Sequence, residues 1–266
     1  MVAGAAVTLV VVALATVTAM GLVVIASTLG FVGLMVEALA LKSMLALRGL
    51  ASTALAIRDD LDAADLDRAR AAVGRDLVSR PTATLEASQV ASAAVESVAE
   101  NFTDAFLAPL LFFVVFGLPG AVAYRVINTA DAMIGYRHGA LLHFGRVAAR
   151  LDDLLNFVPA RLAALALTAA ATLARADGRR AFATMRRDHG RTASPNAGWT
   201  MATMSGALGV TLEKPNFYRL GDGRPATPDD IALAVILMLT AAALTLPPLI
   251  ALTFATSDVR PMITGA

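Results

Sequence analysis

Cysteine is absent from the 266-residue sequence, and charged residues are scarce at 16%. The lack of cysteine excludes disulfide frameworks, thiolate metal sites and cysteine nucleophiles. Soluble proteins carry about 25% charged residues, whereas this chain has 57% hydrophobic residues and a mean hydropathy of +0.67. The net charge is only +1, so no overall positive field would attract nucleic acid. The composition predicts an integral membrane protein that does not bind nucleic acid.

Long apolar runs predict membrane-spanning helices. A helix needs about 20 apolar residues to cross a bilayer, and residues 5–27 and 231–254 both meet this length. We expect the Pro247-Pro248 pair to kink the end of the second span. A helix that follows residue 27 carries Glu37 and is expected to lie partly in the membrane interface.

Two further apolar segments are less regular. Residues 105–127 are apolar but contain Gly117-Leu118-Pro119-Gly120, which favours a broken or re-entrant helix over a straight span. Residues 158–173 are short for a span and predict a buried helix or a marginal one. The predicted fold class is therefore all-α: a polytopic, helical membrane protein of one domain, 1–266, in which interfacial and broken helices carry the polar site.

The charged residues gather in two largely polar segments, 42–104 and 175–230. Residues 42–80 alternate charges of both signs with Ala and Leu, which is typical of a solvated amphipathic helix. Residues 175–191 carry six arginines against two aspartates. Positively charged loops stay on the cytoplasmic side, so we expect both segments there, in the plasma membrane of a prokaryote.

Three carboxylates share one predicted helix face. Glu96, Glu100 and Asp104 follow one another at intervals of four residues. Like charges at this spacing destabilise a helix unless a cation compensates them, and Mg²⁺ prefers oxygen ligands. The alternative is a helix end facing water, with the acids solvated or paired with Arg75 and Arg80.

Two later segments combine arginines with carboxylates and amides: Arg125, Asn128, Asp131 and Arg137 in the first, and Arg150, Asp152, Asp153, Asn156 and Arg161 in the second. Arginine binds phosphate and carboxylate in a bidentate manner. Helical spacing places Asn128 near Asp131, and Asp152 near Asn156. The segments predict anion and metal sites, or alternatively internal ion pairs that join helices.

A predicted loop at residues 189–198 contains Ser194 and Asn196 and precedes a predicted helix. A helix N-terminus of this kind can bind phosphate, or the two residues can simply cap the helix. The sequence contains no Walker loop, Rossmann fingerprint or nucleophile elbow.

Most of these residues fall in six ordered motifs: Gly74-Arg75-Asp76, 95–101, 128–137, 149–153, 159–162 and 194–198. Together they resemble the adenosylcobinamide-phosphate synthase family of cobalamin biosynthesis over about residues 37–218. The sequence departs from the family pattern at Leu77, where threonine is common, and at Glu213-Lys214, where a Gly-Gly pair is common. The family's usual first span is also missing before Val2, so we expect a start that is truncated or misassigned.

The resemblance implies a membrane ligase that joins a carboxyl group of adenosylcobyric acid to the amine of aminopropanol phosphate, or a related amino alcohol. ATP would be the cosubstrate, with Mg²⁺, and the corrinoid would be a substrate. ATP would phosphorylate the carboxylate, and the amine would attack the acyl phosphate. Further partners would be the lipid bilayer and other cobalamin-biosynthesis proteins or a second copy of the chain, with the active site facing the cytoplasm.

Site residues follow from the motifs and the resemblance. The predicted catalytic residues are Glu96, Glu100 and Asp131. The predicted substrate- and phosphate-binding residues are Asn101, Arg125, Asn128, Arg137, Arg150, Arg161, Ser194 and Asn196. The predicted metal ligands are Glu96, Glu100, Asp104, Asp152 and Asp153.

Two other functions use similar residues. A membrane prenyltransferase would hold Mg²⁺ and diphosphate on acidic helix faces, and an ion-coupled transporter would use intramembrane acids beside a broken helix. Diphosphate release from a prenyl donor would identify the first, and flux into sealed vesicles without ATP turnover the second.

Overall fold

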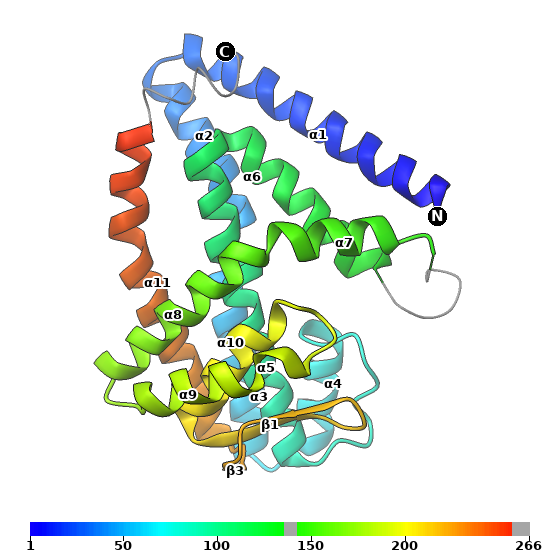
Figure 1. Cartoon of the computed structure of the whole chain (residues 1–266), viewed down its shortest axis with the longest axis vertical. Coiled ribbons are helices and arrows are strands. Elements are labelled where there is room, and N and C mark those ends of the chain that lie inside the picture. The colour runs from blue at the N-terminus through cyan, green and yellow to red at the C-terminus, as the bar shows by residue number, and fades with distance from the viewer. Residues whose placement is uncertain (136–142, 257–266) are drawn as a thin grey trace. The chain divides into compact units, whose positions relative to one another are not determined.

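The computed structural model describes residues 1–135 and 143–256, and most of them are helical (Figure 1). The chain divides into two compact units. Unit 1 comprises Met1–Ala46, Asp104–Pro159 and the chain from Leu246 onward. Unit 2 comprises Leu47–Thr103 and Ala160–Thr245. The single-domain organisation expected from the sequence stays a prediction.

Unit 1 is built on helices α1 (Val2–Thr28), α2 (Phe31–Met44), α6 (Ala108–Ile134) and α7 (Arg146–Leu155). Helix α1 lies beside α6 and contacts α7 (Figure 1). The chain passes very close to α1 at Gly4, where a Cβ atom would lie 1.9 Å from the carbonyl oxygen of Phe144. Glycine therefore permits this approach.

The apolar helices expected over residues 5–27 and 231–254 are present. Three helical segments are long and apolar enough to cross a membrane: Val2–Thr28, Ala87–Ile134 and Pro228–Thr253. Only 11% of the apolar window in the first is buried, so its side chains are available to lipid. Helices α7 and α8 (Phe157–Leu173) form a pair bent by 49°, which could be a fourth, broken span. The chain is an all-α membrane protein.

The expected break in the segment 105–127 is also present. Within α6, Gly117 has φ +68° and ψ −165°, a conformation that interrupts the helix and that glycine adopts without a Cβ penalty. Pro119 follows inside the same helix, and its missing N–H is tolerated where the helix restarts. Helix α11 (Pro228–Thr256), by contrast, continues through Pro247 and Pro248.

A second irregularity precedes α6. Thr103–Leu107 form one turn of π-helix, η1. The carbonyl of Ala105 would accept the N–H of residue 109 in an α-helix, but Pro109 has none. The N–H of Ala46 instead donates to this carbonyl at 3.0 Å. Single π-turns of this kind often occur at functional sites.

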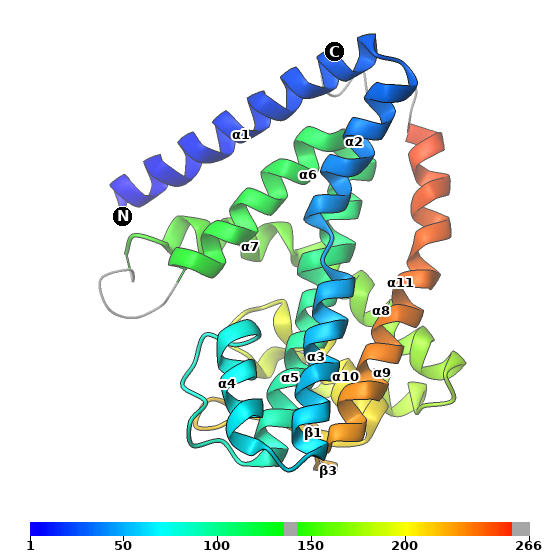
Figure 2. The same cartoon turned by 180° about the vertical axis from the view of Figure 1, so that it is seen from behind.

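Unit 2 is organised around α5 (Ala87–Phe102), whose residues from Val90 to Ala99 are all buried. Its other helices are α3 (Leu47–Asp62), α4 (Leu66–Asp76), α9 (Gly178–Asp188), α10 (Ala197–Leu208), most of α8 and the first part of α11. Figure 2 shows α3 and α4 beside α5. The amphipathic helix expected over 42–80 is thus two helices, with Asp65 capping the second through the N–H of Arg68 at 3.1 Å.

A small sheet in unit 2 was not predicted. Strand β1 (Val210–Lys214) pairs antiparallel with β2 (Tyr218–Leu220) and parallel with β3 (Arg224–Pro225). The register sets Lys214 opposite Tyr218. Asn216 has φ +66° in the connecting turn, a conformation that asparagine tolerates better than most residues. The strands are too short to show a clear alternation in the sequence.

Candidate functional site

Glu96 lies in the middle of α5 and is only 5% exposed. Helix α5 begins with a capping box, in which Glu86 and Gln89 exchange side-chain and backbone hydrogen bonds. Alanine or serine occupies many of the buried positions around Glu96, so neighbouring elements pack closely on the helix. A carboxylate buried in this way requires hydrogen-bond donors or a charged partner.

Both oxygens of Glu96 accept a hydrogen bond. The hydroxyl of Ser92, one turn earlier, donates to Oε1 at 2.8 Å, and the phenol of Tyr218 donates to Oε2 at 2.6 Å. The Ser92 hydroxyl is oriented because it accepts the backbone N–H of Glu213 at 2.9 Å. Strand β1 therefore orients one donor to Glu96, and β2 supplies the other.

Arg80 provides the nearest positive charge. Its Nη2 lies 3.8 Å from Glu96 Oε2, and its side chain is 15% exposed. Both Nε and Nη2 are fully buried, and neither has a hydrogen-bond partner within the described part of the chain. The sequence analysis considered Arg80 only as an alternative partner for the acids, and the ion pair with Glu96 confirms that contact.

Tyr218 is a half-buried residue that the sequence analysis did not select. Burial raises the pKa of Tyr218 above its ordinary value, and the negative charges of Glu96 and Glu100 raise it further. The phenol therefore stays protonated and acts as a hydrogen-bond donor.

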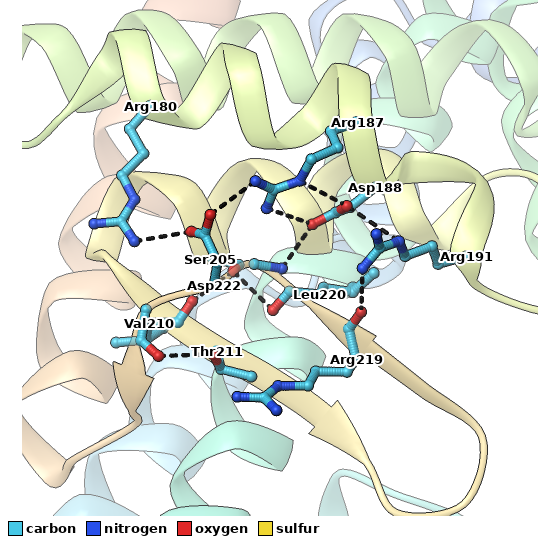
Figure 3. Close-up of polar contacts among 12 residues, drawn as sticks. Arg180, Arg187, Asp188, Arg191, Ser205, Val210, Thr211, Arg219, Leu220 and Asp222 are labelled. Carbon is cyan, nitrogen blue, oxygen red and sulfur yellow. Dashed lines mark hydrogen bonds and ion pairs between the residues drawn. The ribbon is translucent and has the colours of Figure 1, made fainter.

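An arginine–aspartate network fixes the strand that carries Tyr218 (Figure 3). Asp188, fully buried at the end of α9, accepts the backbone N–H of Gly221 at 2.8 Å and pairs with Arg187 and Arg191 at 2.9 and 3.1 Å. Burial alone would raise the pKa of Asp188, but the hydrogen bonds from Arg187 and Gly221 hold it below the ordinary value. The turn after β2 is thus fastened to α9.

Asp222 is an exposed member of the same network. Its carboxylate accepts from Arg180 at 3.1 Å and from Arg187 at 2.8 Å. Three of the arginines that predicted a cytoplasmic loop therefore hold the sheet through their side chains: Arg180, Arg187 and Arg191. Arg191 also donates to the carbonyl of Arg219 in β2 at 3.3 Å.

A second polar network lies in unit 1 and joins the two later motifs. Asp152 in α7 accepts the side-chain amide of Asn128 in α6 at 3.1 Å and that of Asn156 at 3.1 Å. The carbonyl oxygen of Asn156 accepts the phenol of Tyr124 at 2.9 Å. Arg125 donates through Nη1 to Asn128 Oδ1 at 3.1 Å and to the carbonyl of Asp104 at 3.4 Å. Asp152 and Asn156 are on one side, as helical spacing predicted.

Arg161 and Asn196 are brought together in unit 2. Arg161 Nη1 donates to Asn196 Oδ1 at 3.3 Å, and its guanidinium lies 4.6 Å from the centre of the Trp199 ring. His189 stacks on the same ring at 4.1 Å. Asn196 directly precedes α10, but its side chain makes no capping bond. The alternative that Asn196 caps this helix through its side chain is therefore wrong.

The remaining predicted site residues differ in their contacts and in their burial. Asn101 donates to the carbonyl and hydroxyl of Ser97 in its own helix, at 3.0 and 3.1 Å. Arg150 is exposed on α7, and Arg137 lies outside the described residues. The half-buried ones are Glu100, Asp104, Asp131, Asp153 and Ser194. The spacing assumed for Asp104 does not hold, because the regular helix ends at Phe102 and Asp104 lies in η1.

The described carboxylates do not fit a metal cage made by protein alone. Within residues 1–135 and 143–256, no group of three or more histidine, aspartate and glutamate side chains is placed to hold an ion. Both oxygens of Glu96 and both of Asp152 accept hydrogen bonds from side chains. Mg²⁺ usually binds through one or two carboxylates together with substrate phosphates, so the magnesium ligands remain a prediction.

The fold and these networks define a class of protein: a helical membrane protein with buried polar clusters on its helices. Comparison with known families is more specific. The chain belongs to the family described as CobD/Cbib protein, whose family model matches residues 1–243. This match confirms the family predicted from the motifs.

Curated relatives support the same family. The chain is 48% identical over 206 residues to the cobalamin biosynthesis protein CobD of Dehalococcoides mccartyi, a match that covers 77% of this chain and 66% of the relative. It is 46% identical over 160 residues to a probable cobalamin biosynthesis protein CobD of Methanocaldococcus jannaschii, covering 60% and 52%. For the Citrobacter koseri CobD the identity is 39% over 273 residues, covering 99% and 83%. The matches thus cover less than two thirds of the length of the first two relatives. No solved structure matches it.

Proposed function

We propose that this protein is a membrane ligase of cobalamin biosynthesis that forms an amide bond between adenosylcobyric acid and aminopropanol phosphate, or a related amino alcohol. The product would be adenosylcobinamide phosphate, and ATP would drive the reaction. The family match and the relatives' names support a role in this pathway. The buried Glu96 carboxylate, held by two hydroxyl donors, is the observation that supports acid–base chemistry at an identified atom.

The reaction needs an activated carboxyl group, because a free carboxylate is a poor electrophile. In the proposed first step a carboxylate oxygen attacks the γ-phosphorus of ATP, the bond to ADP breaks and an acyl phosphate forms. In the second step the neutral amine attacks the acyl carbon, the carbon–oxygen bond breaks and phosphate leaves. From carboxylate, ATP and ammonium, the products are amide, ADP, hydrogen phosphate and one proton.

Glu96 is the proposed general base. The amine is protonated in solution, so it must lose one proton before it attacks and another as the amide forms. Glu96 can accept such a proton at Oε2 or Oε1, because Ser92 and Tyr218 hold the carboxylate but occupy only one acceptor direction on each oxygen. A general base in reach of the amine contributes about 10²- to 10⁴-fold to the rate.

We further propose that the other predicted residues orient the charged substrates. Arg125, Asn128 and Asp152 form a fixed array in unit 1, in which hydrogen bonds restrict each side chain. Arg161 lies against Trp199 in unit 2 and could bind a phosphoryl oxygen. The magnesium that accompanies ATP belongs to the cosubstrate, and no step above depends on its position.

The proposed location is the prokaryotic plasma membrane, with the arginine-rich segment 175–191 in the cytoplasm, where ATP is available. Three helical segments long enough to span a membrane support the membrane location. Since the sequence has no cysteine, a single cysteine introduced at the exposed Arg179 reports the side directly. Labelling of intact cells by a membrane-impermeant maleimide would contradict a cytoplasmic segment.

The reaction is tested with the full chain in lipid nanodiscs, supplied with adenosylcobyric acid, aminopropanol phosphate and MgATP. The corrinoid product is followed by mass spectrometry and ADP by a coupled assay. We expect product from the native protein and a decrease in kcat of about 10²- to 10⁴-fold in Glu96→Gln, the loss of one general base. Glu86→Gln is the matched control, because Glu86 is exposed at the start of the same helix and glutamine can still accept the capping hydrogen bond.

Two results would contradict the proposal. One is full activity in the Glu96→Gln protein, which would remove Glu96 from the chemistry. The other is a folded native protein that forms no amide, together with either diphosphate release from a prenyl donor or solute flux without ATP turnover, the outcomes expected of a prenyltransferase or a transporter.

A further inference from the structure

We infer that Arg80 binds an anionic oxygen pair of a substrate, a carboxylate or a phosphoryl group, directly beside Glu96. This inference deepens the proposed function and rests on it for the identity of the anion. No sequence motif selected Arg80 as a binding residue, and its assignment comes from the geometry of one edge of its guanidinium group.

That edge is buried and has no hydrogen-bond partner. The Nε and Nη2 atoms of Arg80 are both inaccessible to solvent, and neither donates a hydrogen bond within the described residues. Buried polar groups are nearly always hydrogen-bonded, and a buried charged donor without an acceptor is costly. A pair of unused donors on one arginine therefore points to an acceptor that the chain itself does not supply.

Other arginines in the same chain show what this edge normally binds. Arg75 uses Nε and Nη2 to hold the two carboxylate oxygens of Asp76, at 2.9 and 2.7 Å. Arg187 uses the same two atoms to hold Asp188, at 3.0 and 2.9 Å. The matching edge of Arg80 is therefore a bidentate site for two oxygens of one anion.

Glu96 does not fill this site. The distance of 3.8 Å between Arg80 Nη2 and Glu96 Oε2 exceeds that of a hydrogen bond. Both Glu96 oxygens already accept from Ser92 and Tyr218 at shorter distances. Glu96 thus compensates the charge of Arg80 at a distance, while Nε and Nη2 of Arg80 remain without an acceptor among the described residues.

The segment that follows Arg80 is anchored at two points. The hydroxyl of Thr82 donates to the carbonyl of Arg70 at 2.8 Å, and Arg70 Nε donates to the carbonyl of Leu85 at 2.7 Å. Helix α4 thus holds the connection to α5 at two points. Arg80 is placed before any ligand binds, which lowers the entropic cost of binding.

Arg80 and Glu96 would have different roles in the proposed reaction: Arg80 would bind the anion, and Glu96 would accept a proton. An anion held by Arg80 would lie next to Glu96, so an amine that approaches it could pass its proton to the Glu96 carboxylate. If the anion is the corrinoid carboxylate, Arg80 positions the group that becomes the amide. If it is a phosphoryl group, Arg80 positions ATP or the amino-alcohol phosphate. Both groups present two anionic oxygens on one central atom, which is what a bidentate guanidinium edge binds.

Chemical modification separates the sources without turnover. The full chain in nanodiscs is treated with phenylglyoxal, and the modification of each arginine is measured by peptide mass spectrometry. The probes are inorganic phosphate, a non-hydrolysable ATP analogue and adenosylcobyric acid, each added alone. We expect one probe to slow modification of Arg80 at least fivefold and to leave Arg75, which is exposed and paired with Asp76, unchanged. The protecting probe identifies the anion. If none of the three probes slows the modification of Arg80 relative to the protein without a probe, the inference is overturned.

Kinetics provide the second test. We expect Arg80→Gln to raise KM for the protecting substrate at least tenfold, with a smaller rise in Arg80→Lys, while Arg75→Gln matches the native protein. Unchanged KM in an active Arg80→Gln protein would overturn the role of Arg80 and leave the ligase proposal intact. Protection of Arg80 in a native protein that forms no amide would support anion binding and reject the ligase.

Loss of folding in Arg80→Gln would not end the test. The substitution leaves Glu96 buried without its positive neighbour, so the neutral pair Arg80→Gln/Glu96→Gln is compared with Glu96→Gln alone. Equilibrium dialysis with the protecting probe measures binding in both. We expect at least tenfold weaker binding in the double variant, and equal binding would overturn the inference.

Discussion

The phenol of Tyr218 donates a 2.6 Å hydrogen bond to the carboxylate of Glu96, although the two residues are 122 positions apart in the sequence. This bond joins a short strand to a largely buried helix of unit 2. It fixes the orientation of the buried Glu96 carboxylate, which in the proposed reaction would receive the proton of the substrate amine.

We expect Tyr218 and Glu96 to be energetically coupled. A hydrogen bond to a charged group contributes about 1.5–3 kcal/mol, so Tyr218→Phe and Glu96→Gln should be non-additive by an amount in this range. The measurement is a double-mutant cycle of unfolding free energies in mixed micelles. Additive effects of the two substitutions would show that the hydrogen bond does not form in solution.

The network around Asp152 predicts a rescue by exchange. Asp152→Asn places an amide donor against the donors of Asn128 or Asn156, and we expect a loss of about 1–3 kcal/mol in stability. In the double exchange Asp152→Asn/Asn156→Asp every donor again faces an acceptor, including the phenol of Tyr124. Thermal unfolding of the single and double variants should therefore show recovery in the double variant. A double variant that is less stable than both single variants would contradict the observed arrangement of donors.

Asp188 should make stability depend on pH. Its pKa in the folded protein lies below the ordinary value of 3.8, so the unfolded chain binds the proton more readily. The stabilisation is fully present above the ordinary pKa and is lost as the pH falls through the lower, folded value. We expect Asp188→Asn to lose about 1.5–3 kcal/mol at neutral pH and to show a weaker decline of stability in acid. Unfolding free energies measured from pH 6 to pH 2 test this, with Asp222→Asn, at the exposed end of the same network, as a milder control.

Gly206 should be essential to the contact between α10 and α9. A Cβ atom there would lie 2.6 Å from the carbonyl oxygen of Arg180 and 2.7 Å from Cα of Ala181. Because backbone atoms cannot move aside cheaply, we expect Gly206→Ala to cost about 1–3 kcal/mol. Gly49→Ala is the control, since Gly49 is exposed in α3 with open space around it and alanine favours a helix by about 0.5–1 kcal/mol. Equal melting temperatures for the two variants would rule out this close packing.

Local features of the fold could be predicted from the sequence. The spans at residues 5–27 and 231–254 follow from uninterrupted apolar composition, which depends on neighbours along the chain. The break at Gly117 follows from the Gly-Leu-Pro-Gly sequence, because glycine and proline act on the backbone directly. The two-helix division of residues 42–80 was missed, since Ala63 to Asp65 do not interrupt the amphipathic pattern strongly.

Only part of the candidate site could be predicted from the sequence. Glu96 could be selected because an acid in an apolar helix is unusual, and the pairing of Asp152 with Asn156 follows from helical spacing. Asn128 was selected, but its contact with Asp152 depends on the packing of α6 on α7. Tyr218 gave no local signal, and Arg80 entered only as an alternative partner of the acids, because the role of each depends on the distant carboxylate that it approaches.

The sequence by itself determined that this is a helical membrane protein of the CobD/Cbib family, because hydropathy and ordered motifs are properties of the chain. Only the tertiary structure decided which polar groups meet. The partners of Glu96 come from a strand and from a connection between helices, and such pairings are set by the packing of whole elements, which no spacing along the chain encodes.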